Sequence, residues 1–250
     1  MKIFNRYLSG IAIIAGVSLA VYYFIRVLFF LSVDYGSIDR IFAVLLLLGE
    51  TYMIVHAFGY VLAVFRLGSG KDLYEFVEKP SRTLPQVAVA VVARHEPANV
   101  LEQTFVTLGN LEYVNKKLYL LDGSDEESFI KADQALCEKY GINYFHPNKR
   151  AKTKGATVNQ FLKSIQEEYV ALLDADQNPM PDFLQKVVAI AESDEKIAFV
   201  QTPQFYSNVD VSPIAKGAAM QQAVFFEGTC ESKGLTNSMF FCGTNALFRR

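Results

Sequence analysis

Two long apolar segments near the start of the chain constrain its fold more than any other feature. Residues 8–33 and 41–65 are almost continuously hydrophobic, and each is longer than the roughly 20 residues that a helix needs to cross a bilayer. The first segment is also much longer than the apolar core of a cleaved signal peptide, and no small-residue cleavage site follows it. The pattern therefore predicts a hairpin of two transmembrane helices.

Basic residues flank this hairpin at its outer ends. Lys2 and Arg6 precede the first segment and Arg66 and Lys71 follow the second, whereas the connection 34–40 holds one arginine and two aspartates. Cytoplasmic loops of membrane proteins are enriched in Lys and Arg. We therefore expect a multi-pass protein of the cell membrane, with both ends of the hairpin and the remainder of the chain on the cytoplasmic side.

Arg26 and Glu50 lie inside the apolar segments, where an isolated charge is costly. Arg26 stands seven residues before Val33 and Glu50 stands nine residues after Ile41, so an antiparallel hairpin places both at a similar depth. We expect them to form an ion pair. The alternative is that Arg26 reaches toward the membrane surface while Glu50 stays protonated.

Charge and cysteine content limit the partners of the remaining chain. The 24 basic and 26 acidic residues leave a formal charge of −2, so no overall basic field argues for nucleic acid as a partner. Cys137, Cys230 and Cys242 are odd in number and form no C-x-x-C pair, which disfavours a disulfide framework and a structural zinc site. A reducing cytosolic environment is the simplest interpretation.

The pattern divides the chain into the hairpin (1–68), an interfacial linker (69–85) and a region of alternating strands and helices (86–250). Such alternation is typical of an α/β fold with a mostly parallel sheet. The expected strands are 86–93, 117–122, 142–145, 169–176 and 197–202, and the expected helices are 97–111, 126–140, 155–168 and 182–193. An apolar strand interrupted by Gly243 is expected near the end.

Polar residues follow these strands, at the edge where open α/β sheets bind their ligands. They are Arg94, His95 and Glu96 after the first strand, Asp122 and Asp125 after the second, Asp174 and Asp176 after the fourth, and Gln201, Thr202 and Gln204 after the fifth. His95 and Glu96 are expected to line the site, because no second histidine stands at metal-ligand spacing and no nucleophile motif accompanies them.

Asp174 and Asp176 alternate at the end of a buried run, which directs both carboxylates to the same side. Mg²⁺ or Mn²⁺ prefers such oxygen ligands and leaves coordination positions for substrate phosphates. An EF-hand is excluded, because Pro179 stands where its glycine is required and Gln185 where its glutamate is required. The remaining alternative is that the two aspartates merely cap the following helix.

Four basic residues, Lys149, Arg150, Lys152 and Lys154, precede Gly155 at an expected helix start. Phosphates favour the N-terminus of a helix, where backbone N–H groups point outward. The alternative is an ordinary solvated loop. The spacing does not match a P-loop, because no glycine stands five residues before Gly155.

Together these motifs resemble the processive family-two glycosyltransferases, the cellulose synthase-like membrane enzymes. The segments that carry the resemblance are VAVVARHEP, YLLDGSD, KRAKTKG, LLDADQNPMPDFL, FVQTPQFYSN and FFCGTNALFRR. The resemblance implies a GT-A-type nucleotide-sugar-binding domain, present here in incomplete form. It also implies that, with Mg²⁺ or Mn²⁺, a sugar passes from a UDP-sugar or similar donor to a growing β-linked polysaccharide, with inversion.

The resemblance further implies roles for individual residues. Glu96 would lie by the nucleotide, Asp122 would contact the uridine, Lys154 would neutralise phosphate, and Asp174 and Asp176 would hold the diphosphate and the metal. The residues expected to line the sugar or the acceptor are Gln201, Thr202, Gln204, Cys242, Gly243 and Thr244.

Two departures from the family pattern qualify this expectation. Leu121 and Asp122 stand where the family has paired aspartates, and Arg250 comes before any Thr-Glu-Asp or Gln-x-x-Arg-Trp motif. The general base is therefore expected beyond Arg250, and the chain alone is expected to be inactive. The alternatives are an enzyme that adds one sugar to a lipid carrier and a non-catalytic nucleotide-sugar-binding membrane module.

Overall fold

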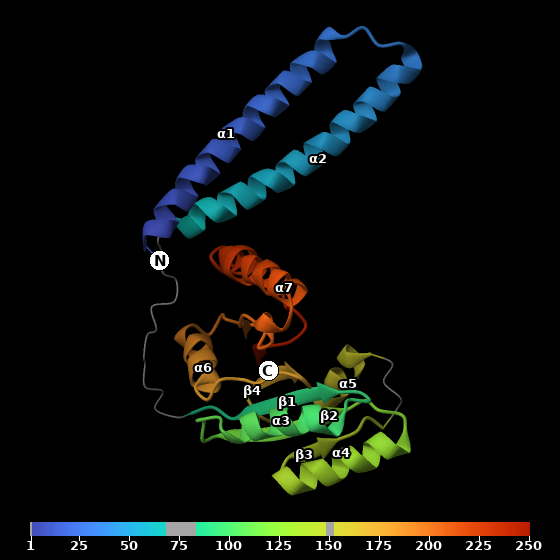
Figure 1. Cartoon of the computed structure of the whole chain (residues 1–250), viewed down its shortest axis with the longest axis vertical. Coiled ribbons are helices and arrows are strands. Elements are labelled where there is room, and N and C mark those ends of the chain that lie inside the picture. The colour runs from blue at the N-terminus through green and yellow to red at the C-terminus, as the bar shows by residue number, and fades with distance from the viewer. Residues whose placement is uncertain (1, 69–83, 149–152) are drawn as a thin grey trace. The chain divides into compact units, whose positions relative to one another are not determined.

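The computed structural model describes residues 2–68, 84–148 and 153–250 (Figure 1). Residues 69–83 of the expected interfacial linker, and the basic residues Lys149, Arg150 and Lys152, lie outside these residues.

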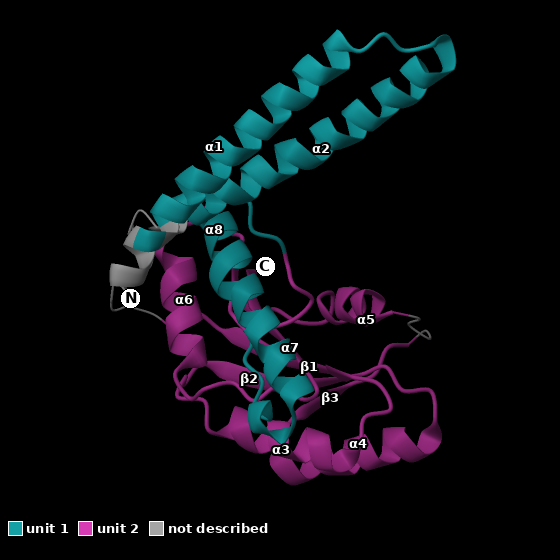
Figure 2. Ribbon diagram, turned by 45° about the horizontal axis from the view of Figure 1, so that its top comes forward, with its two compact units in different colours: residues 1–73, 204–240 teal, residues 74–203, 241–250 magenta. Residues whose placement is uncertain are grey.

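Two compact units make up the chain, as Figure 2 shows. Unit 1 comprises Met1–Leu73 and Gln204–Phe240, and unit 2 comprises Tyr74–Pro203 and Phe241–Arg250. The sequence pattern instead assigns all of 86–250 to one domain, and these domain boundaries stay a prediction.

Unit 1 begins with the two long helices that the apolar segments predict, α1 (Lys2–Ser32) and α2 (Ser37–Gly68). Their segments Ser9–Ser32 and Ser37–Arg66 are long and apolar enough to cross a membrane. In the most apolar 18-residue stretch of each segment, only 6% and 0% of the residues are buried. The core helices of a soluble unit would be mostly buried. This exposed apolar surface is the kind that lipid covers.

Polar residues join α1 and α2 within the hairpin. Arg26 Nε lies 2.8 Å from Glu50 Oε2, so the expected ion pair is confirmed. The Tyr23 and Thr51 hydroxyl oxygens lie 2.6 Å apart and share a hydrogen bond. These contacts pair polar groups that would be costly in isolation within hydrocarbon.

The rest of unit 1 is helical and consists of η1 (Val209–Val211), α7 (Pro213–Ala223), the π-helix η2 (Val224–Cys230) and α8 (Glu231–Gly234). The Ser212 hydroxyl caps α7 by accepting from the Ala215 N–H at 3.1 Å, and Pro213 occupies the first turn, where a proline is tolerated. Both η2 and α8 pack against α2. The sequence pattern assigns no structure to this stretch.

Unit 2 contains a six-stranded sheet with the order β3-β2-β1-β4-β6-β5. β1, β2, β3 and β4 are parallel to one another, whereas β6 runs antiparallel to both of its neighbours, β4 and β5. The strands are β1 (Val87–Ala93), β2 (Lys116–Asp122), β3 (Asn143–Phe145), β4 (Tyr169–Asp174), β5 (Phe199–Gln201) and β6 (Ala246–Arg249). The mostly parallel α/β sheet is therefore confirmed.

Helices cover both faces of this sheet. Alternate residues of β1 point to opposite faces, so Val89 belongs to one buried cluster and Ala90 to the other. The first cluster includes residues of α3 (Ala98–Gly109), α4 (Glu127–Tyr140) and α6 (Phe183–Ser193), and the second includes residues of α5 (Lys154–Phe161). Burial on both faces explains why β1 is a run of valine and alanine without polar residues.

The expected elements differ from the structure in two places. α5 ends at Phe161 rather than near residue 168, because the chain then turns and the Ser164 N–H and hydroxyl both bind the Phe161 carbonyl. The last strand covers only 246–249, because Gly243 and Asn245 have positive φ angles of 93° and 55° that interrupt an extended chain.

Glu167 occupies the opposite end of the sheet from the carboxyl ends of the parallel strands. Its side chain is 2% exposed and accepts hydrogen bonds from the Tyr119 hydroxyl at 3.0 Å and the Gln166 N–H at 3.0 Å, while Lys117 Nζ lies 2.8 Å away. Burial acts to raise the pKa of Glu167, but the hydrogen bonds from Lys117, the backbone and Tyr119 lower it to about 2. This carboxylate is therefore a fully partnered anchor between β2 and β4.

Candidate functional site

The carboxyl ends of β1, β2 and β4 meet at one edge of the sheet. The register aligns Ala93 of β1 with Asp122 of β2, and Val92 of β1 with Asp174 of β4. The Gly123 N–H extends this alignment by donating to the Ala93 carbonyl at 2.9 Å. The structure thus places the two strand-end aspartates on either side of β1.

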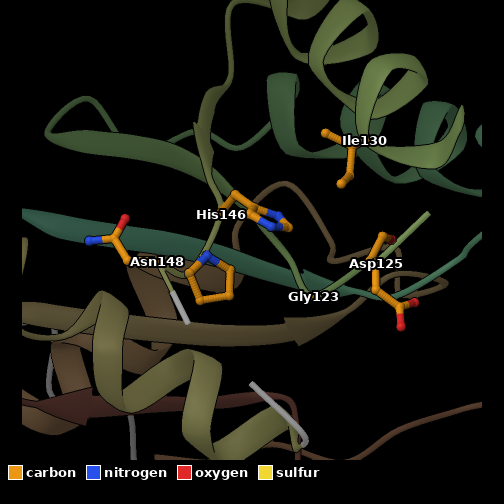
Figure 3. Close-up of a pocket in the computed structure, with 7 residues that line it drawn as sticks. Gly123, Asp125, Ile130, His146 and Asn148 are labelled. Carbon is orange, nitrogen blue, oxygen red and sulfur yellow. The ribbon is translucent and has the colours of Figure 1, made fainter. Parts of the chain in front are cut away.

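A pocket of about 610 Å³ opens where β2 and β3 end. This volume lies within the usual range for small-molecule sites. Figure 3 shows the His146 imidazole directed toward the side of the pocket on which Ile130 and Asp125 lie. The lining residues are Gly123, Ser124, Asp125, Ile130, His146, Pro147 and Asn148.

Asp122 supports this pocket from behind. The side chain is completely buried, its Oδ1 accepts from the Ser124 N–H at 2.7 Å, and its Oδ2 accepts from the Tyr144 hydroxyl at 2.6 Å. His146 Nδ1 lies 3.8 Å from the same Oδ2. Asp122 therefore holds pocket-lining residues in place with both carboxylate oxygens, and its expected contact with a nucleotide stays a prediction.

Tyr144 keeps its proton throughout the physiological pH range. Burial and the hydrogen bond to Asp122 raise the pKa of Tyr144 well above its ordinary value. Its ring stacks against the His146 ring with an interplanar angle of 5°. Tyr144 thus couples the buried carboxylate to the imidazole that faces the pocket.

His95 reaches the same pocket from β1. Its φ angle of 56° is rare for a residue other than glycine, and its N–H donates to the Ser124 hydroxyl at 2.9 Å. His95 Nε2 lies 2.7 Å from Asp125 Oδ1. These contacts place His95 beside two pocket-lining residues, and its expected role in lining the site stays a prediction. Glu96 follows it in a half-buried position, and its role by the nucleotide stays a prediction.

Asp133 lies on α4, where its carboxyl group is 1% exposed and its Oδ2 has no hydrogen-bond partner among the described residues. Burial, together with the negative charges of Asp122 and Glu96, raises the pKa of Asp133 to about 7. The structure therefore keeps an incompletely partnered acid next to the Asp122 network.

Lys154, Asp174 and Gly243 come together at the other side of β1. The Lys154 ammonium group forms a close ion pair with Asp174 Oδ1 and donates to the Gly243 carbonyl at 2.8 Å. Lys154 begins α5, Asp174 ends β4, and Gly243 precedes β6. Lys154, which the sequence selects for phosphate, is thus in direct contact with both Asp174 and Gly243, which the sequence selects for metal and acceptor.

Gln177 makes a second connection at this point. Its Oε1 accepts from the Asp174 N–H at 3.0 Å and from the Thr244 hydroxyl at 2.6 Å. The amide thereby ties the acidic turn after β4 to the segment before β6. Asp176, in the same turn, is exposed.

Gln201 and Thr202 hold the segment before β6 through its backbone. Gln201 Oε1 accepts from the Cys242 N–H at 3.0 Å, and its Nε2 donates to the Thr244 carbonyl at 2.8 Å. The Thr202 hydroxyl donates to the Asn245 carbonyl at 3.0 Å. The polar atoms of Gln201 and Thr202 thus position this segment, and their predicted contact with a sugar stays a prediction.

Gln204 belongs to unit 1 rather than to unit 2, which holds the other candidate residues. Its side-chain oxygen accepts from Gln222 Nε2 at 3.2 Å. The predicted role of Gln204 in lining the sugar is not tested by this arrangement.

The acidic turn fits a divalent cation only as part of a larger site. Asp174 and Asp176 supply carboxylate oxygens, which Mg²⁺ and Mn²⁺ prefer, and the side chain of Asp174 already holds a positive charge in Lys154. Among the described residues, no group of three or more His, Cys, Asp or Glu residues could hold a metal ion. The residues therefore suit an ion whose remaining ligands come from a substrate. The alternative that Asp174 and Asp176 cap the following helix is wrong, because α6 starts after Asp182.

Four residues of this edge are missing from the sequence-based expectation, namely Tyr144, His146, Asp133 and Gln177. His146 follows the expected strand 142–145, so the rule that ligands lie beyond strand ends could have found it. The other three give no local signal, because their importance depends on which residues they meet in the folded chain.

The chain matches the family model described as glycosyl transferase family 2 over residues 88–250. The chain therefore belongs to glycosyl transferase family 2. The match begins inside β1 and covers the whole sheet edge described above, and with the mostly parallel sheet it confirms the GT-A-type α/β fold.

Several curated relatives are cellulose synthases. The UDP-forming cellulose synthase catalytic subunit of Pseudomonas fluorescens (strain SBW25) is 29% identical over 222 residues, which cover 85% of this chain and 29% of that protein. A UDP-forming cellulose synthase catalytic subunit of Dictyostelium discoideum is 41% identical over 105 residues, which cover 41% of this chain and 10% of that protein. The chain thus spans less than a third of the length of these relatives.

A solved mannosyltransferase from Pyrobaculum calidifontis, in complex with GDP-Man and Mn²⁺, matches 79% of this chain and 48% of that chain. The TM-score is 0.44 and the sequence identity is 17%. The family assignment rests on the sequence match.

Proposed function

We propose that the protein is a membrane-bound glycosyltransferase that transfers a sugar, with inversion, from a UDP-sugar to a growing β-linked polysaccharide. The observation that carries the proposal is the direct contact of Lys154 with both Asp174 and Gly243 at one edge of the sheet, beside the pocket where β2 and β3 end. Membership of the family and the UDP-forming relatives support the choice of reaction and nucleotide.

The nucleoside would occupy the pocket between β2 and β3. The stacked Tyr144 and His146 rings and the Asp122 carboxylate hold the pocket wall rigid, so little ordering is needed when a planar base enters. A Cβ atom at Gly123 would lie 3.7 Å from the Thr157 hydroxyl of α5, so the pocket is close to the helix that carries Lys154.

The diphosphate would extend from this pocket toward the N-terminus of α5. Lys154 supplies a positive charge there, and the N-terminus of a helix favours an anion. Asp174 and Asp176 would hold a divalent cation, Mg²⁺ or Mn²⁺, which stabilises the negative charge that develops on the departing diphosphate. Gly243 and Thr244 would face the acceptor on the far side of the sugar.

The two apolar helices would anchor the enzyme in the cell membrane, with unit 2 on the cytoplasmic side. Their exposed apolar surface and the confirmed Arg26–Glu50 pair support this arrangement. We further propose that the general base belongs to the part of the relatives' length that this chain does not span, so that the chain alone binds the donor without turning it over.

Calorimetry with UDP tests the donor site. Binding is expected in Mn²⁺ or Mg²⁺ and is expected to weaken at least 100-fold in EDTA or in the double variant Asp174→Asn with Asp176→Asn. Asp182→Asn is the matched control, because Asp182 pairs with the neighbouring Lys186 on the surface of α6. Metal-independent UDP binding that survives the double substitution would refute the site.

The product distinguishes the polymerase from an enzyme that adds one sugar to a lipid carrier. In membranes containing the chain extended to the length of its cellulose synthase relatives, a panel of radiolabelled UDP-sugars should yield a product that stays in the water-insoluble or high-molecular-weight fraction. A single sugar that partitions with polyprenyl phosphate would favour the second reaction. UDP binding without any transfer would favour a non-catalytic nucleotide-sugar-binding module.

A further inference from the structure

Lys154 binds two groups with a single ammonium. One is the carboxylate oxygen Oδ1 of Asp174, and the other is the backbone carbonyl of Gly243, at 2.8 Å. The Lys154 and Asp174 side chains are 35% and 40% exposed, so a ligand can reach both. The ammonium therefore stands where a ligand would meet the acidic turn.

A divalent cation bound to either oxygen of the Asp174 carboxylate would lie close to the Lys154 ammonium, which pairs with Oδ1. Two cations held by one carboxylate repel each other strongly at such short range. Binding of Mg²⁺ or Mn²⁺ at Asp174 therefore requires the lysine side chain to move away. The phosphate groups of the donor offer the lysine a new anionic partner.

Gly243 loses its hydrogen-bond donor when Lys154 moves. Gly243 adopts a φ angle of 93°, and without a side chain it can take up many other backbone conformations. Thr244 is tied to the acidic turn through Gln177, by contacts that do not involve Lys154. The movement of Lys154 would thus free one peptide unit while its neighbour stays fixed.

We propose that Lys154 is the internal counter-ion of Asp174 in the donor-free protein, and that donor and metal binding draw it away from Asp174 and release the Gly243 backbone. This inference rests on the proposed donor site and adds a link from that site to the segment expected to meet the acceptor. The same lysine then serves the donor phosphates.

Manganese alone tests the first half of the inference. Electron paramagnetic resonance measures free Mn²⁺ during titration of the whole chain in detergent. Lys154→Met keeps the length of the side chain and removes its charge, so it is expected to bind Mn²⁺ about tenfold more tightly than the wild type. Lys163→Met is the matched control, because Lys163 is an exposed residue just after α5, and it should bind Mn²⁺ as the wild type does.

UDP affinity in saturating Mn²⁺ should change in the opposite direction. Lys154→Met is expected to bind UDP about tenfold more weakly, because a phosphate contact is lost. A lysine with a merely structural role would weaken the binding of both ligands when replaced. Unchanged UDP affinity would overturn the transfer of Lys154 to the phosphates.

Cys242 reports on the release of Gly243. Without ligands, a maleimide should label Cys242 faster in Lys154→Met than in the wild type or in Lys163→Met, with Cys242→Ser as the background. Equal labelling rates would overturn the release of the backbone.

The two proposals fail in different ways. If the wild type binds UDP with Mn²⁺ but Lys154→Met binds Mn²⁺ no more tightly, the counter-ion inference is wrong and the donor site stands. If no variant binds either Mn²⁺ or UDP, both are wrong.

Discussion

Glu167 and Asp133 are both buried carboxyl groups of unit 2, at 2% and 1% exposure, yet their surroundings differ in kind. Glu167 is met by Lys117, Tyr119 and a backbone N–H, and its pKa falls to about 2. Asp133 has an oxygen without a hydrogen-bond partner in the described part of the chain, faces the charge of Asp122, and has a pKa of about 7. The buried carboxylate at the Glu167 end of the sheet stabilises the fold, whereas the buried carboxyl group near the pocket destabilises it.

Neutralising Asp133 should give the largest change in stability. The folded-state pKa lies above the unfolded value of 3.8, so the folded protein loses stability as the pH rises from about 4 to about 7. Asp133→Asn should therefore raise the free energy of unfolding by about 2–4 kcal/mol at pH 8 and by little at pH 4. Pulse proteolysis in urea measures this difference.

Glu138→Gln, on the exposed side of the same helix, is the control for Asp133→Asn. If Asp133→Asn destabilises the protein at pH 8, the carboxyl group of Asp133 has a stabilising partner and the contrast with Glu167 disappears.

Neutralising Glu167 should have the opposite effect. Its folded-state pKa of about 2 lies below the unfolded value of 4.5, so its contribution is complete above about pH 4.5 and is lost as the pH falls toward 2. Glu167→Gln should lower the free energy of unfolding by about 2–3 kcal/mol at pH 7. The same proteolysis assay should show no such loss for the exposed Glu195→Gln.

UDP affinity sharpens this contrast further. Glu167 lies away from the pocket, so folded Glu167→Gln should bind UDP as the wild type does. A variant that is stable at low temperature but binds UDP at least tenfold more weakly would show that the two ends of the sheet are coupled.

Tyr144→Phe should produce a smaller change, confined to the pocket. The substitution removes one hydrogen bond to the buried Asp122 carboxylate, which should cost about 1–2 kcal/mol of stability and weaken UDP binding about three- to tenfold. Tyr140→Phe is the matched control, because its hydroxyl donates to the exposed Glu102 carboxylate instead. Equal effects of the two substitutions on UDP binding would contradict the supporting role of Asp122.

Sequence reasoning succeeded where a local pattern reports on a global constraint. Valine-rich runs mark strands that are buried on both faces, and matching depth in a hairpin predicted the Arg26–Glu50 pair. The rule that ligands lie beyond strand ends selected Asp122 and Asp174, which the register places on either side of β1.

Sequence reasoning failed where the outcome depends on tertiary partners. Nothing in the residues around Asp133 distinguishes it from an exposed helical aspartate, and Gln177 becomes important only because it meets Thr244. The helix α7 did have a local signal in Ser212, Pro213 and the alanine-rich stretch that follows. No local sequence signal indicated that α7 belongs to unit 1 with the apolar hairpin.

The strand order has a consequence for how the protein acquires its structure during synthesis. β5 is an edge strand that pairs only with β6 among the described strands, and β6 comes from the ribosome after residues 202–245. Until β6 has been synthesised, β5 has no partner and the edge of β4 that β6 will cover remains open. The pairing of β5 with β6 also requires the closure of a long loop. The intervening residues 204–240 belong to unit 1. Completion of the sheet is therefore the last event in its folding, and nascent chains that stop before β6 should be open to protease and prone to aggregation.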